Sequence, residues 1–235
     1  MTEHVIDYGK NRIKFLLEQK PRKSFKISVL PDLSVGVSAP SQLSIDKILS
    51  RVKQRGSWII KQMDYFKLFL PKQPPRQYVS GETHCYLGRQ YLLKAEKGKI
   101  QDVKLKGKFI IVRQGNIQKS KVKERLYEWY RLRARCVFES MLERCQKRVQ
   151  KYGIVCPTVE IRTMKSRWGS CTHAKGKICL NTELVKSPSH CIEYVVMHEL
   201  CHLKYRNHNK QFYNFLTLVM PDWQKRKERL ERVLI

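Results

Sequence analysis

Three histidines and one glutamate near the end of the chain have the spacing of a metal-dependent hydrolase. His198, Glu199 and His202 form an HExxH pattern, and His208 follows shortly after it. On an α-helix, residues four apart lie about 40° apart around the axis, so His198 and His202 can bind one metal ion from a single face. Glu199 lies about 100° around from His198, within reach of a metal-bound water that it does not itself ligate. The pattern predicts a hydrolytic metal site.

His208 is predicted to be the third ligand, once the helix has ended and the chain has turned back. Three protein ligands leave one position for water, as a catalytic zinc requires, whereas a structural zinc is closed by a fourth ligand. Asn207 suits the left-handed conformation, and we predict that it ends the helix and turns His208 inward. The predicted cofactor is one Zn²⁺ ion.

The residues before the HExxH pattern favour the helix that it needs. The segment 191–197 contains neither glycine nor proline. An apolar arc beside the histidine face would let the helix be buried while it presents its ligands; it consists of Ile192, Val196, Leu200 and Leu203. The alternative is an amphipathic surface helix with Glu199 in a solvated ion pair. The helix, the pattern and the third histidine together favour the metal site.

The four residues Trp168, Gly169, Ser170 and Cys171 precede this helix in the sequence, before a predicted turn around 173–177. They are the candidate substrate-binding residues, because an edge strand here could pair with an extended peptide. A structural hairpin with Trp168 in the core explains the same residues. The sequence leaves both interpretations open.

Composition describes a chain of 235 residues, 42% hydrophobic and 29% charged. No stretch approaches the roughly 20 apolar residues that cross a bilayer, and the first residues lack the hydrophobic core of a signal peptide. We therefore expect a cytoplasmic protein without membrane association. None of the eight cysteines forms a C-x-x-C pair, which argues against a zinc ribbon, and a disulfide framework fits poorly with a missing secretion signal.

Positive charge is the second strong feature, with a formal net charge of +28 at pH 7. Such a field favours DNA, RNA or acidic proteins as partners. The charge is diffuse, however, and no nucleic-acid reading motif accompanies it. A basic surface that is simply solvated explains it equally well, and the oligomeric state is not predicted.

The pattern along the chain predicts an α+β protein. Residues 1–118 form a β-rich region with strands near 12–17, 24–30 and 34–37, one long helix over 44–70, and further strands at 103–105 and 109–112. Residues 119–235 begin with a long basic helix and contain the predicted metal helix. We expect a boundary after residue 118, although one continuous domain fits the same pattern.

Several further segments resemble one family. At 168–171, 180–181, 194–202 and 207–212, and upstream at 80–82 and 86–91, the chain resembles the YgjP-like zinc metallopeptidases. The resemblance covers nearly the whole length. It implies a zincin-like core, three histidine ligands at His198, His202 and His208, catalysis by Glu199, and a protein or peptide substrate. The family is related in its catalytic core to SprT-like proteases that act on DNA-associated proteins.

Other assignments of the site fit the sequence less well. The spacing from His202 to His208 equals that of the metzincins, but Tyr205 replaces their glycine. A thermolysin-like site would use a downstream glutamate such as Glu228 as its third ligand. A nucleic-acid or nucleoprotein-binding module with a structural or vestigial zinc site, or a zinc hydrolase acting on a non-peptide bond, would be a different function altogether. The resemblance favours a peptidase that acts on proteins, nucleic-acid-associated ones among them.

Overall fold

The computed structural model describes every residue except 1, 23, 31, 68–74, 165–166 and 234–235, and it shows a mixed α+β chain. The chain divides into two compact units, Met1–Gln73 and Pro74–Leu234. Each unit has a hydrophobic core of its own. The division therefore falls earlier than the boundary expected after residue 118. The reason is that strands within residues 83–114 bury Tyr86, Leu93 and Ile110 in the same core as the long helix that follows them.

The N-terminal unit is built on a four-stranded sheet with the order β1-β2-β4-β3. Its strands are β1 (Thr2–Tyr8), β2 (Asn11–Lys20), β3 (Lys26–Val29) and β4 (Val35–Pro40). Strand β2 pairs antiparallel with β1 and parallel with β4, and β3 pairs antiparallel with β4. Every second residue of β2 from Ile13 to Leu17 is buried, as expected of a strand that has one face on a core.

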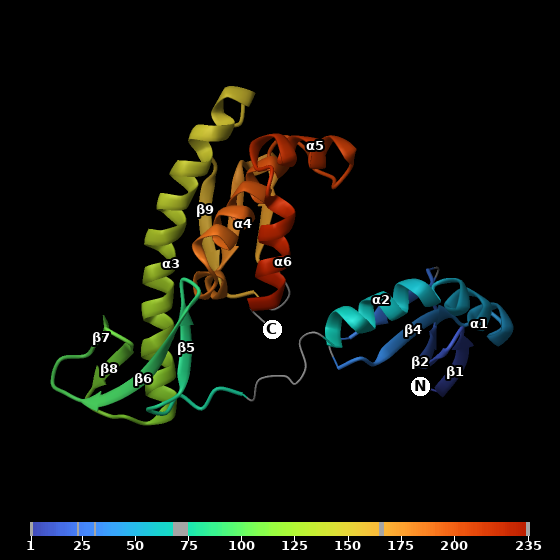
Figure 1. The fold of residues 1–235 in the computed structure, drawn as a ribbon, viewed down its shortest axis with the longest axis horizontal. Coiled ribbons are helices and arrows are strands. Elements are labelled where there is room, and N and C mark those ends of the chain that lie inside the picture. The colour runs from blue at the N-terminus through green and yellow to red at the C-terminus, as the bar shows by residue number, and fades with distance from the viewer. Residues whose placement is uncertain (1, 23, 31, 68–74, 165–166, 234–235) are drawn as a thin grey trace. The chain divides into compact units, whose positions relative to one another are not determined.

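Two helices, α1 (Ile45–Gln54) and α2 (Gly56–Lys67), belong to the same unit (Figure 1). The sequence predicted one helical stretch over 44–70, of which 68–70 lie outside the described residues. The structure separates the two helices at Arg55. Ile48, Val52 and Ile59 are fully buried. Gly56 is needed where α2 begins, because a Cβ there would lie 2.3 Å from Cδ2 of the Tyr8 ring.

The C-terminal unit begins with a second four-stranded sheet of order β5-β6-β8-β7. Its strands are β5 (Thr83–Tyr86), β6 (Arg89–Lys97), β7 (Asp102–Lys106) and β8 (Phe109–Gln114). A three-stranded sheet of order β10-β11-β9 follows, made of β9 (Thr158–Arg162), β10 (Gly169–Thr172) and β11 (Lys177–Asn181). Strand β10 pairs antiparallel with β11 and forms one edge of this sheet.

The long helix α3 (Lys119–Val149), a helix that the sequence predicted, connects these two sheets. It contacts β7 and β8 of the first sheet and β9 of the second, and it also packs against the helix α4 (Figure 1). Its buried residues recur every three or four positions from Val122 to Val149. A single helix therefore fixes how the two sheets of this unit are placed.

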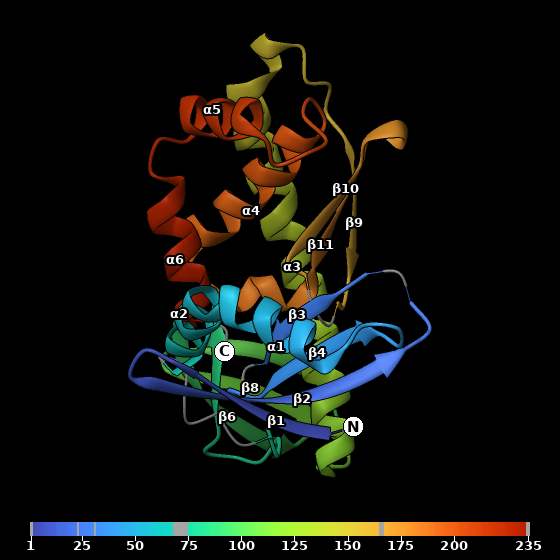
Figure 2. The ribbon, with the colours of Figure 1, turned by 90° about the vertical axis from the view of Figure 1, so that its right-hand side faces the viewer.

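Helix α4 (Ser189–His202) contains the HExxH pattern, and most of its residues from Cys191 onward are buried. It contacts β10 and β11 of the three-stranded sheet, α3, and the two last helices α5 (Lys210–Val219) and α6 (Trp223–Val233) (Figure 2). Short 3-10 helices lie at Gln150–Tyr152, His173–Lys175 and Thr182–Lys186. In the described part of the chain, no helix is both long and apolar enough to cross a membrane.

Candidate metal centre

The three histidines that the sequence predicted as ligands come together in space. The Nε2 atoms of His198 and His202, both on α4, lie 3.2 Å apart. Nε2 of His208, on the connection between α4 and α5, lies 3.0 Å from each of them. No other group of three or more His, Cys, Asp or Glu side chains with this proximity occurs among the described residues.

The connection from α4 to α5 brings His208 to the other two histidines, although Asn207 within it is not left-handed. Helix α4 ends at His202, and the amide of Tyr205 donates to the Cys201 carbonyl at 2.9 Å, which turns the chain. Asn209 then caps α5 by accepting a backbone hydrogen bond through its side chain. Asn207 is not among the described residues with positive φ. The prediction that Asn207 ends the helix in the left-handed conformation is therefore wrong. The Tyr205–Cys201 backbone hydrogen bond and the Asn209 cap turn the chain instead.

One hydrogen bond sets the tautomer of His202. Its Nδ1 lies 3.0 Å from the backbone oxygen of Tyr205. Because a carbonyl can only accept, Nδ1 carries the proton and Nε2 is left with its lone pair toward the other two histidines. Burial, together with the neighbouring His202 and His208, lowers the pKa of His198 to about 3. Burial also lowers the pKa of His208. Both rings are therefore neutral at physiological pH, the form in which an imidazole can bind a metal.

Phe212 packs against all three imidazoles and forms the floor beneath them. Its ring centroid lies 5.0 Å from that of His198, 4.6 Å from that of His202 and 4.8 Å from that of His208. The Phe212 side chain is fully buried in the main core of the C-terminal unit. Tyr213, the next residue, stacks on His208 at 6.0 Å. The rings are thus held by packing, and sequence reasoning missed Phe212 because nothing local distinguishes it from an ordinary core residue.

Glu199 lies on α4 beside the histidines, with only 5% of the residue exposed. Burial raises the pKa of its carboxyl group to about 8, and the positive charge of Arg167 acts in the opposite direction. Strand β10 approaches it very closely. A Cβ on Gly169 would lie 2.7 Å from Oε1 of Glu199, a distance that no side chain at that position tolerates unless the carboxylate moves. Because residue 169 is glycine, the edge strand β10 and the Glu199 carboxylate can lie in contact on one side of the site.

Comparison with known proteins identifies the family. A model described as YgjP-like, metallopeptidase domain, matches residues 23–233. The chain belongs to the YgjP-like family. Among solved structures it is similar to the metallopeptidase zymogen of Pyrococcus abyssi abylysin, with 23% identity, a TM-score of 0.36, and coverage of 40% of this chain and 90% of that one.

A second similar structure is the metallopeptidase zymogen of Methanocaldococcus jannaschii jannalysin. It has 21% identity and a TM-score of 0.36, and the match covers 42% of this chain and 90% of that one. A comparison with curated proteins gives no match. By family, this YgjP-like chain is a zinc metallopeptidase, a hydrolase that acts on peptides or proteins with a catalytic metal.

The geometry of the histidines fits such a metal. Zinc–nitrogen distances of about 2.0–2.1 Å place the nitrogens of a tetrahedral site roughly 3.3–3.4 Å apart. The observed separations of 3.0–3.2 Å are close to this. Three ring nitrogens at this distance also need a shared cation, because a single proton can join only one pair of them at a time. His198, His202 and His208 would hold the metal, and Glu228 on α6 is not part of the cluster.

The histidines and Glu199 open into a cleft of about 470 Å³. Of the four residues predicted to bind substrate, Gly169, Ser170 and Cys171 line this cleft, whereas Trp168 packs against the core. Sequence reasoning missed Arg167, His173 and Arg206, which complete the wall. None of these three belongs to a spaced pattern, so only the fold could reveal them. The cleft therefore combines one buried carboxylate, four imidazoles (the three clustered ones and that of His173) and two guanidinium groups.

Proposed function

We propose that this chain hydrolyses peptide bonds in the cleft of α4 and β10, with His198, His202 and His208 holding one zinc ion and Glu199 acting as general base. The observation that carries the proposal is the convergence of three imidazole Nε2 atoms beside a buried carboxylate in one open cleft. Three ligands rather than four support a catalytic over a structural zinc. The architecture around α4 supports a zincin-like core.

A zinc ion bound there lowers the pKa of a coordinated water and polarises the carbonyl that is attacked. Glu199 accepts the proton of the attacking water on its carboxylate and returns it to the amine that leaves. Its buried position keeps this proton away from bulk solvent between the two transfers. Burial raises the pKa of Glu199, and the positive charge of Arg167 offsets part of that effect in favour of the ionised carboxylate, the form able to accept a proton.

Strand β10 provides a means of placing the substrate. It is an edge strand, its partner β11 lies on one side only, and three of its residues line the cleft. An extended peptide can add to such an edge through backbone hydrogen bonds, which are independent of the peptide's side chains. Gly169, Ser170 and Cys171 would then contact the peptide backbone next to Glu199. This mode of binding predicts broad selectivity and a preference for unfolded segments.

The test is Glu199→Gln, assayed by cleavage of a fluorescently labelled, unfolded protein and by metal analysis. We expect zinc content equal to the parent and a rate lower by about 100- to 10,000-fold, the range that general acid–base catalysis contributes. Glu228→Gln is the matched control, because Glu228 is an exposed glutamate on α6 outside the cluster. Hydrolysis at the parent rate by Glu199→Gln would remove the assigned role.

A further inference from the structure

The N-terminal unit contains a pocket that the peptidase chemistry does not use. It has a volume of about 520 Å³, within the roughly 300–1,000 Å³ of small-molecule sites. Seven residues line it, from β3 and the turn before it and from α1 and α2: Phe25, Lys26, Ile27, Arg51, Gln54, Arg55 and Trp58. Of these lining residues none is acidic. The pocket is thus positively charged and partly aromatic.

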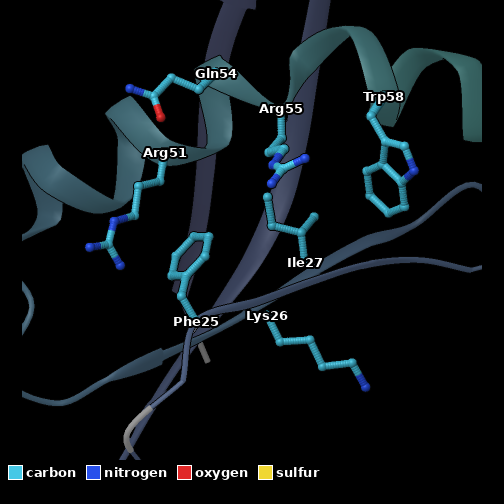
Figure 3. Close-up of a pocket in the computed structure, with 7 residues that line it drawn as sticks. All are labelled: Phe25, Lys26, Ile27, Arg51, Gln54, Arg55 and Trp58. Carbon is cyan, nitrogen blue, oxygen red and sulfur yellow. The ribbon is translucent and has the colours of Figure 1, made fainter. Parts of the chain in front are cut away.

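Two features arrange the side chains of the pocket (Figure 3). Successive side chains of β3 point in alternate directions, and the chain turns between α1 and α2. Phe25 and Ile27 point toward the helices and make the floor, whereas Lys26 points away from them at the rim. The Arg51 guanidinium lies 5.6 Å from the centre of the Phe25 ring. Arg55 projects between Phe25 and Trp58. An aromatic surface and cationic groups therefore alternate across the pocket.

Trp58 is the residue that the fold leaves unexplained. The helical spacing of α2 predicts it in the buried stripe with Ile59 and Met63, yet 41% of it is exposed. Met63 packs against the core of the N-terminal unit and Ile59 lies within it, but Trp58 is in neither group. A solvent-facing indole next to two arginines has a free face on which a flat ring can stack.

The cations of the pocket form no ion pair with the residues that the structure describes. Across the described residues, no carboxylate lies within ion-pair distance of Lys26, Arg51 or Arg55. Their charge is therefore available to an anion from outside. An acidic peptide would satisfy these charges but would leave the indole face unused. A phosphate joined to a planar base satisfies both.

The geometry points to this pocket as a binding site for single-stranded nucleic acid, with a base stacked on Trp58 and phosphates held by Arg51 and Arg55. Aromatic stacking and cationic contacts of this kind bind single strands with little sequence preference. A duplex keeps its base faces stacked inside and cannot present them to the indole. The site is independent of the proposed peptidase chemistry, since its residues all lie in the other unit.

The test is fluorescence polarisation of the full chain with short fluorescein-labelled oligouridylate, oligothymidylate and a duplex of the same length. We expect both single strands, or one of them, to bind more tightly than the duplex. Trp58→Ala should weaken single-strand binding about tenfold, and Trp58→Phe should restore most of it, because stacking needs a ring rather than an indole. Tighter binding of oligouridylate would identify RNA as the ligand, and tighter binding of oligothymidylate would identify DNA.

A double variant separates the pocket from diffuse charge. Arg51→Gln with Arg55→Gln should weaken binding about tenfold and reduce the salt dependence by about two phosphate contacts. Lys47→Gln with Lys53→Gln removes the same charge from exposed positions of the same helix outside the pocket, and it should have little effect. Equal losses from both double variants, an unchanged affinity in Trp58→Ala, or equally tight binding of polyglutamate would each overturn the proposal.

Discussion

The two units each have a cleft that combines cations with aromatic rings, but they treat the rings in opposite ways. Beneath the histidines, Phe212 is fully buried and touches all three imidazoles. In the N-terminal pocket, Trp58 is 41% exposed. A buried ring fixes the position of its neighbours, whereas an exposed ring has a surface that a ligand can contact. The contrast separates a site built for positioned atoms from a site built for contact.

The carboxylates differ in the same way. The C-terminal cleft contains the buried Glu199, set against Gly169 of the edge strand. The N-terminal pocket has no acidic residue among those that line it. A proton acceptor is needed where a bond is broken, and it would oppose the binding of an anion. The charges of each cleft therefore agree with the function proposed for it.

The largest effect is expected from removing a histidine. His202→Ala should lose bound zinc and all peptide hydrolysis. Removing a group that only hydrogen-bonds to a metal ligand costs about 10- to 100-fold in metal affinity, and removing a ligand itself costs more. His173→Ala is the matched control, since His173 lines the same cleft outside the cluster. Metal analysis after gel filtration decides the outcome. Stoichiometric zinc in His202→Ala would mean that these imidazoles are not the site.

The buried and exposed rings can be compared directly. Phe212→Ala should destabilise the C-terminal unit by about 3–5 kcal/mol, as expected for truncating a buried phenylalanine, and should loosen the zinc. Trp58→Ala should change the stability of its unit by no more than about 0.5 kcal/mol, because an exposed side chain leaves no cavity. Hydrogen exchange of the α4 and α2 amides measures the two units separately. Similar losses at both positions would contradict the contrast between them.

Gly169 tests whether the edge strand sets the position of the base. In Gly169→Ala the new methyl group meets the Glu199 carboxylate, so we expect an unchanged zinc content and a rate lower by about 10- to 100-fold. Ser170→Ala is a change of similar size at the next position of the same strand, and the rate should stay close to the parent's. A full rate in Gly169→Ala would show that the carboxylate can move without cost.

The sequence predicts features that lie within one segment better than features formed by segments far apart in the chain. The HExxH spacing and the helix that carries it lie within one segment, and so does the periodicity of α3, and the structure has helices at both places. Phe212, Arg206 and the wall formed by Gly169 depend on elements distant in sequence that meet only in the fold. The first strand, β1, was missed because it has an exposed face and only Ile6 buried.

The domain boundary was displaced for a related reason. The sequence has prolines at 71, 74 and 75, but the strand pattern after them resembles the strand pattern before them, so the prolines alone do not mark a domain boundary. Only the packing of Tyr86, Leu93 and Ile110 against α3 assigns them to the second unit. Side-chain patterns predict that a strand has a buried face, and they do not predict which core covers that face.

Gly56 is the counterpart of Gly169 in the N-terminal unit, and replacing it is expected to have the smallest effect on peptide hydrolysis. Replacing glycine by alanine in a helix normally stabilises by up to about 1 kcal/mol. Here the added Cβ would lie 2.3 Å from the Tyr8 ring, so Gly56→Ala should instead destabilise the unit by about 1–3 kcal/mol, the usual cost of overpacking. Hydrogen exchange of β1 and α2 gives the sign, with Ser57→Ala as the exposed neighbour for comparison. Peptide hydrolysis should be unchanged, and a loss of it would show that the two units are coupled in catalysis. A stabilised variant would instead show that Tyr8 rotates away freely, and that the junction of α1 and α2 beside Trp58 is not held by this contact.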